Sequence, residues 1–389
     1  MHLDHLLLAL LILLVISATA VTLSRRLGLG SILGLLIAGV LIGPTGLGLA
    51  QRVDEIREVS ELGIVFLLFL IGLEMQPQRL WSMRRVVFGL GSAQVVVTGL
   101  ALALYVLFIG QAWNVALLLG LGLALSSTAF VLPMLEERGQ MAAPHGRAAF
   151  GILLLQDLAI VPLLALLPLL ANQESSSGNG TLLWKTATVL IALAAVYVLG
   201  RFIMPAVLQR LVERGNTEAF AMAVVAAVIG AAWAMLRAGL SMALGAFMIG
   251  LLLSESPHRH RMEAVVEPFK AVLLGLFFIA IGMGIDLSLV PEVGLRLVAH
   301  VAALIAIKVV VLAVLGLAFG LAPVDASRCA LLLGQAGEFG FVLLGAALAD
   351  GLLPREGFAL AALIISISLA TTPVLAALAD RIGMGRRPA

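Results

Sequence analysis

The sequence predicts an all-α polytopic membrane protein with about 13 transmembrane helices, arranged as inverted repeats with crossed, interrupted helices. Composition is the first observation, since 62% of the 389 residues are hydrophobic and only 12% are charged. A soluble domain carries roughly 25% charged residues, so lipid must cover most of this surface. The second observation is a series of apolar runs of helix length, and the third is an internal repeat. A spanning helix satisfies its own backbone groups in lipid, which favours helices over strands.

The apolar runs supply the expected helices in order, with short polar loops between them. The first run lacks a basic n-region and a cleavage site, so a retained helix is expected rather than a signal peptide. The thirteen runs are 3–23, 30–49, 60–76, 86–109, 113–135, 147–171, 182–209, 217–236, 239–254, 267–286, 292–320, 327–349 and 356–380.

Basic residues predict the orientation of these helices. Loops after odd-numbered runs are rich in arginine, as at Arg84, Arg138 and Arg214, whereas loops after even-numbered runs carry few, such as Arg237 and Arg355. Because basic loops stay in the cytoplasm, the N-terminus is expected outside and the C-terminus in the cytoplasm of a bacterial inner membrane. The pI of about 9.0 then reflects topology, and no nucleic-acid partner is expected.

An internal repeat recurs at an offset of 211 residues. The glycine-rich pattern of 28–41 returns at 239–252, Phe130-Val131-Leu132 returns at 341–343, and the pattern of 158–165 returns at 369–376. Three blocks in one register make chance identity an unsatisfactory explanation.

The offset contains seven apolar runs, an odd number, so the second copy is expected upside down relative to the first. Inverted repeats with interrupted helices near the midplane are typical of secondary transporters. The copies are placed at about 24–170 and 235–381, and run 182–209 is expected to link them.

Two runs are expected to break. Run 113–135 carries Ser126, Ser127 and Thr128 at mid-depth, and run 327–349 carries Gln335 and Glu338 among glycines. Such residues are costly in lipid unless the backbone opens and lines a cavity. For the serine and threonine cluster an alternative stays open, since these hydroxyls could bond within their own helix or to a neighbouring helix.

Three charged residues lie deep inside apolar runs: Asp157, Lys308 and Glu338. A charge at the bilayer centre costs roughly 2.5–3.5 kcal/mol on insertion scales, so each is a functional candidate. Asp157 is the strongest. Lys308 could act in function, or could only neutralise Glu338, Asp157 or the carbonyls of a helix end. A supporting role is expected for Glu338.

One buried carboxylate predicts exchange chemistry. Burial favours the protonated form, and an approaching cation favours the ionised form, so proton and cation compete for Asp157. Oxygens of Gln156, Ser126, Ser127 and Thr128 suit a hard alkali ion. The expected activity is monovalent cation/proton antiport, electrically silent with one ion exchanged for one proton, and with no resident cofactor. Potassium and sodium both fit.

These residues also resemble a known family. The chain resembles the membrane domain of Kef-type potassium-efflux systems of the monovalent cation:proton antiporter-2 family over nearly its whole length. The segments that carry the resemblance are 26–34, 69–74, 123–129, 155–157, 267–270, 274–279, 333–335 and 338–339.

The resemblance implies a sodium/proton antiporter-like fold, a homodimer in membrane lipid, and a transport domain that moves in an elevator-like way. It also implies that the pair Gln156-Asp157 marks an electroneutral member. In relatives with two aspartates, a lysine at the place of Lys308 pairs with the first aspartate, which is Gln156 here.

Kef-type relatives also continue into a cytoplasmic nucleotide- and glutathione-sensing domain. No such nucleotide-binding domain is expected in this chain. The chain is expected to be either part of a longer protein, with regulation from the missing domain or from a separate cytoplasmic subunit, or an unregulated relative. The regulatory loop of those relatives corresponds to a segment that keeps His260 and Glu263 here but lacks the family's aspartate.

The main alternative function is a ligand-gated potassium-efflux channel, although no repeated filter sequence supports it. A non-transporting membrane subunit would need no buried carboxylate. A membrane enzyme is least expected, because no metal-ligand cluster or nucleophile/base pair lies at membrane depth.

Overall fold

The computed structural model describes residues 2–27, 30–44, 46–48, 53–75, 81–170, 179–285 and 290–384. Within these ranges the chain is helical and contains no strand. The elements are α1 (His2–Arg26), α2 (Gly30–Ile42), α3 (Val53–Glu74), the π-helical η1 (Arg85–Gly91), α5 (Ser92–Phe108), α6 (Trp113–Ala124), α7 (Thr128–Glu137), α8 (Pro144–Leu170), α9 (Asn179–Val198), the π-helical η2 (Leu199–Ile203), α10 (Met204–Glu213), α11 (Thr217–Arg237), α12 (Met242–Leu253), α13 (Arg259–Met283), α14 (Val290–Ala318), α15 (Pro323–Leu332), α16 (Glu338–Ala349), α17 (Arg355–Ala370) and α18 (Thr372–Met384).

The helices confirm the predicted all-α polytopic fold. Every one of the thirteen apolar runs coincides with a helix or with consecutive helical segments. Among the described residues, seven helices are long and apolar enough to cross a membrane, and eight if the bent pair α17 and α18 forms one span. The count of thirteen crossings therefore stays a prediction.

Helix boundaries recur at close to the offset of the repeat. Helix α6 begins at Trp113 and α15 at Pro323, while α7 begins at Thr128 and α16 at Glu338. Packing recurs as well, since α1 packs on α2 as α11 packs on α12, and α5 packs on α6 as α14 packs on α15. The inverted orientation of the two copies stays a prediction. Gly28 and Leu29, which open the first repeat block, lie outside the described residues.

The turns that follow α5 and α14 share one geometry. Gly110 and Gly320 both have a positive φ, at 95° and 88°. In each turn the next residue donates its N–H to a carbonyl one turn back in the helix, Gln111 to Val106 and Leu321 to Gly316. This is the glycine-terminated helix end that allows a tight return.

The chain divides into two compact units. Unit 1 consists of residues 1–54, 83–160 and 278–389, and unit 2 of residues 55–82 and 161–277, so the boundaries fall inside α3, α8 and α13 and just before η1. In unit 2, α3 and α12 meet at glycines, since a Cβ on Gly250 would lie 2.2 Å from the Phe69 carbonyl oxygen. Its core includes the fully buried rings of Phe69 and Phe220.

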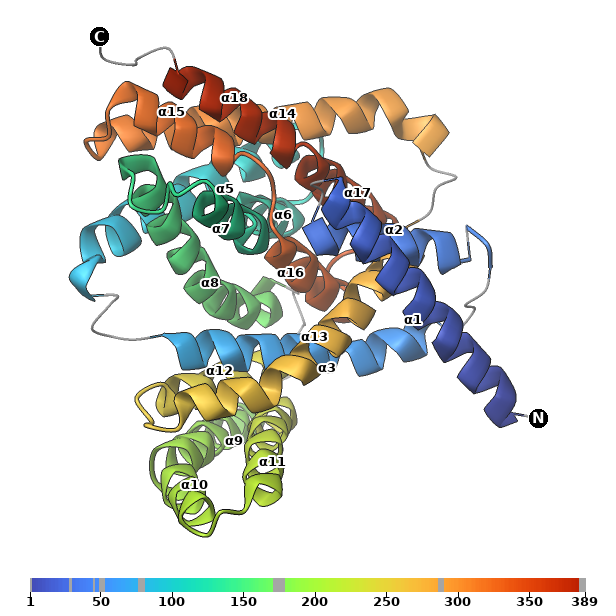
Figure 1. Ribbon diagram of the computed structural model, residues 1–389, viewed down its shortest axis with the longest axis vertical. Coiled ribbons are helices and arrows are strands. Elements are labelled where there is room, and N and C mark those ends of the chain that lie inside the picture. The colour runs from blue at the N-terminus through green and yellow to red at the C-terminus, as the bar shows by residue number, and fades with distance from the viewer. Residues whose placement is uncertain are drawn as a thin grey trace. The chain divides into compact units, whose positions relative to one another are not determined.

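Unit 1 contains the residues that the sequence singles out for cation and proton binding. Figure 1 shows the non-helical stretch that joins α15 to α16 in this unit, and α16 packs on α6. Glycines bring α8 against η1, because a Cβ on Gly91 would lie 2.9 Å from the Leu155 side chain and one on Gly151 would lie 2.5 Å from Val86. This close packing fixes the part of α8 that carries Asp157.

Candidate cation and proton site

Two helices are interrupted in unit 1, and their breaks cross as predicted. Extended backbone at 125–127 separates α6 from α7, and residues 333–337 separate α15 from α16. The Ser126 hydroxyl donates to the Leu333 carbonyl oxygen at 2.8 Å. At Gly337 the two backbones touch, because a Cβ there would lie 2.4 Å from the Ser126 carbonyl oxygen.

Asp157 lies beside this crossing. The residue is half-buried on α8, and its Oδ1 accepts a hydrogen bond from the Thr128 hydroxyl at 2.9 Å. Thr128 is the first residue of α7. The N-terminus of a helix carries partial positive charge, which stabilises a nearby carboxylate. The structure therefore brings together Asp157, Thr128 and the break at 125–127.

Lys308 caps the end of α6. Its ammonium is fully buried and donates to the carbonyl oxygens of Leu123, Ala124 and Leu125 at 3.1, 3.0 and 2.9 Å. An ammonium has three N–H donors, so these three acceptors use them all. Of the roles left open by the sequence, binding to helix C-terminal carbonyls is the one that this geometry shows.

Glu338 occupies the opposite kind of helix end. It is the first residue of α16, is only 7% exposed, and accepts the Ala129 backbone N–H on Oε1 at 3.1 Å. Its carboxylate thus lies at the N-termini of both α7 and α16, where negative charge is favourable. Lys308 and Glu338 complement the termini of the broken helices.

Several polar atoms near the crossing are buried without a hydrogen-bond partner. They include the Ser127 hydroxyl, both amide atoms of Gln335 and Oε2 of Glu338. Each such atom costs about 1–3 kcal/mol unless something else satisfies it. The hydroxyl, amide and carboxyl oxygens among these atoms are ligands that a hard monovalent cation prefers.

Gln156 is fully buried, and its amide is bonded within the protein. Its Oε1 accepts the Ser126 backbone N–H at 2.7 Å, and its Nε2 donates to Oε1 of Gln94 at 2.6 Å. Sequence reasoning missed Gln94, which is fully buried on α5. The signal was available, because an amide inside an apolar helix is costly unless it is paired.

His260 and Glu263 lie elsewhere, in unit 2. The sequence placed them in a loop, which is wrong, since both belong to the first turns of α13. They form an exposed contact of 3.4 Å between Nδ1 of His260 and Oε2 of Glu263. Their spacing of three residues makes them neighbours on the surface of this helix.

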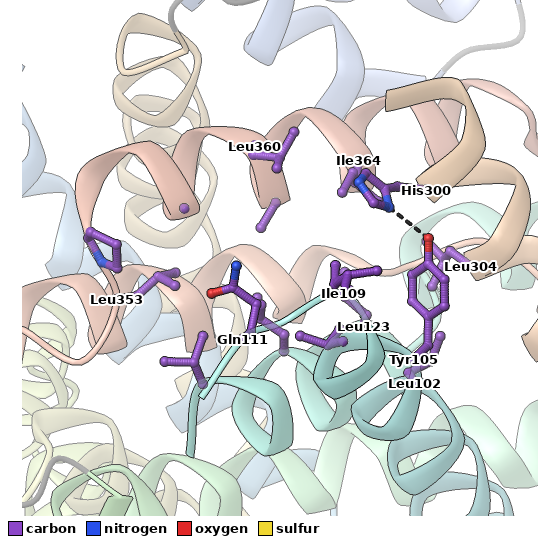
Figure 2. A pocket seen from close by; sticks show the side chains of 16 residues that line it. Leu102, Tyr105, Ile109, Gln111, Leu123, His300, Leu304, Leu353, Leu360 and Ile364 are labelled. Atoms are coloured by element: carbon purple, nitrogen blue, oxygen red, sulfur yellow. Dashed lines mark hydrogen bonds between the residues drawn. The ribbon is translucent and has the colours of Figure 1, made fainter. Parts of the chain in front are cut away.

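A second feature of unit 1 is an apolar pocket of about 110 Å³ between α5, α6, α14 and the start of α17 (Figure 2). Its polar lining residues are Tyr105, Gln111 and His300, and the Tyr105 hydroxyl lies 2.7 Å from Nδ1 of His300. Neither Asp157 nor Glu338 lines this pocket. Its chemistry does not suit a cation.

Comparisons with known proteins agree with the fold. A family model described as sodium/hydrogen exchanger, transmembrane, matches residues 10–377. The glutathione-regulated potassium-efflux system protein KefC of Salmonella heidelberg is 43% identical over 379 residues, and that of Salmonella paratyphi B is 44% identical over 380 residues. In both cases the match covers 97% of this chain and 61% of the relative.

Among solved structures, the sodium proton antiporter MjNhaP1 from Methanocaldococcus jannaschii at pH 8 is similar, with a TM-score of 0.67 at 17% identity. The alignment covers 97% of this chain and 99% of that one. At this identity the likeness shows a common fold.

Proposed function

Because the chain belongs to the sodium/hydrogen exchanger family, we propose that it is a monovalent cation:proton antiporter, with potassium as the first candidate cation. The observation that carries this proposal is the half-buried carboxylate of Asp157 beside the crossed breaks. The relatives whose names describe potassium efflux support potassium over sodium.

Competition for Asp157 is the proposed mechanism. A proton on the carboxyl removes the charge that attracts the cation, and a bound cation disfavours protonation. Thr128 and the oxygens of the break would complete the cation's coordination, in place of water. If the carrier changes orientation only when Asp157 is occupied, each cation that leaves one side must be replaced by a proton.

One-for-one, electrically silent exchange follows from the charges of Asp157, Lys308 and Glu338. Lys308 and Glu338 are buried at helix termini, where each complements a helix dipole, and we propose that neither changes its charge during the cycle. Asp157 is then the one carrier group, and its complex with either ion is neutral. Rates that respond to an imposed membrane potential at fixed pH would contradict this stoichiometry.

The proposed setting is the bacterial inner membrane, as a multi-pass homodimer that acts as a transporter and not as an enzyme. The chain spans 61% of the length of the curated relatives it matches, so their regulation by glutathione belongs to longer proteins. We propose that a regulatory domain or subunit outside this chain acts on it, with His260 and Glu263 on α13 as contact candidates.

Reconstituted vesicles test the proposal. We expect addition of potassium outside acid-loaded vesicles to dequench an internal pH dye, with sodium, rubidium and lithium ranking the selectivity. Asp157→Asn should abolish the signal, because an amide carries no exchangeable charge. Asp350→Asn, a matched change on an exposed residue after α16, should leave it intact. Potassium current without proton movement would instead establish the channel.

A further inference from the structure

A chain of side-chain amides joins the break between α6 and α7 to the end of α6. The Ser126 backbone N–H donates to Gln156 at 2.7 Å, Gln156 donates to Gln94 at 2.6 Å, and Gln94 donates to the Ala124 carbonyl oxygen at 3.0 Å. All four residues are fully buried. The chain thus runs from an N–H inside the break to the C=O of Ala124, the last residue of α6.

Backbone groups fix the direction of this chain. The Ser126 N–H can only donate, so the oxygen of Gln156 must face it, and its NH₂ group then faces Gln94. The Ala124 carbonyl can only accept, so the NH₂ group of Gln94 must face it. The hydrogen-bond partners therefore determine which atom of each amide is the oxygen and which is the nitrogen.

We propose that Gln94 is a positioning residue of the exchanger. Together with Gln156 it holds residues 125–127 in the extended conformation that places Thr128 against Asp157, an inference that rests on the proposed exchange function. Gln156 then acts on the backbone through its carbonyl oxygen and supports Asp157, its neighbour on α8, instead of serving as a ligand for the cation.

The need for such a chain follows from burial. An interrupted helix leaves backbone N–H and C=O groups unpaired. Inside the hydrocarbon region of a membrane there is no bulk water to satisfy them. Lys308 satisfies carbonyls on the α6 side but has no acceptor for an N–H. The two glutamines satisfy the Ser126 N–H and add a second donor to Ala124. The open backbone becomes the ordered state before a cation arrives, so binding does not have to order it.

The test compares Gln94→Met, Gln156→Met and the double variant in the vesicle exchange assay, per folded transporter. Methionine keeps the length of glutamine but removes the amide. We expect each single change to raise the cation concentration for half-maximal exchange about tenfold, as one buried hydrogen bond left unmade would do, with little change in maximal rate. A purely structural role would lower the yield of folded protein and leave that concentration unchanged.

The double variant decides whether the two residues act together. Members of one chain are not additive, so the double change should raise the half-maximal concentration little more than one single change does. A multiplicative increase, or wild-type cation dependence in Gln94→Met, would overturn the proposal. Gln209→Met, the same change on the exposed side of α10, should match the wild type. If wild-type protein shows no exchange at all, the proposed function fails instead.

Discussion

Lys308 shows at the scale of one residue why a buried charge persists here. Desolvation of an ammonium is costly, and only close partners repay it. Its three carbonyl partners lie at the C-terminal end of α6, and of these only Ala124 has a second side-chain donor among the described residues, Gln94. The ammonium and the broken helix therefore stabilise each other.

Replacing Lys308 with methionine should destabilise the protein by about 2–6 kcal/mol, because the buried carbonyls of Leu123 and Leu125 lose their ammonium donor at about 1–3 kcal/mol each, while Ala124 keeps Gln94. Thermal unfolding of the detergent-solubilised protein measures the change. Lys270→Met is the matched control, since Lys270 pairs with a half-exposed Glu267 at 2.7 Å and such a pair contributes about 1 kcal/mol or less. Equal shifts in the two variants would refute the capping role.

At the scale of elements, the site depends on two helices that stop and restart. Neither break is explained by proline, which kinks helices elsewhere. The breaks persist because side chains satisfy the opened backbone, through Lys308, Glu338 and the two glutamines, and because Gly337 lets one break lie directly on the other.

Gly337→Ala should be strongly destabilising for this reason. The added Cβ would lie 2.4 and 2.5 Å from the carbonyl oxygen and carbon of Ser126, backbone atoms that cannot move aside alone. We expect the free energy of unfolding to fall by about 1–3 kcal/mol. We also expect the cation concentration for half-maximal exchange to rise. Gly230→Ala on α11, where a Cβ would meet no atom within 4 Å, should be neutral or slightly stabilising. A neutral Gly337→Ala would contradict the close crossing.

Sequence reasoning predicted these elements well where the signal was a polar residue in an apolar run. Ser126, Gln335 and Glu338 marked the breaks, and Asp157 marked the carboxylate. Contacts were a different matter. The sequence left Lys308 between several partners. Gln94 was missed, although it is an amide in an apolar run and so needs a partner. Which side chain that partner is depends on how α5, α6 and α8 pack, and the residue pattern does not show this packing.

At the scale of the whole molecule, the repeat supplies the scaffold and the differences between copies supply the site. Asp157 corresponds to Ser368, whose hydroxyl accepts the Ala336 backbone N–H at 3.1 Å and donates to Ile365 at 2.8 Å. In that position the side chain serves the break of the second copy. The two copies of the repeat therefore carry different chemistry at corresponding positions.

The predicted orientation can be tested by thiol labelling of intact cells. A cysteine at Gln111, in the turn after α5, should react with a membrane-impermeant reagent, whereas one at Arg214, after α10, should react only once the membrane is opened. Both positions are exposed, and the native Cys329 is buried, so background should be low. The reverse labelling pattern would invert the topology derived from arginine counts.

Competition between one cation and one proton for Asp157 can be measured as proton release on cation binding. Potassium added to purified transporter in weakly buffered detergent solution, at a pH where Asp157 is protonated, should release about one proton per ion bound. Asp157→Asn should release none. Wild-type protein that binds potassium without releasing a proton, or an Asp157→Asn variant that still releases one, would contradict the claim.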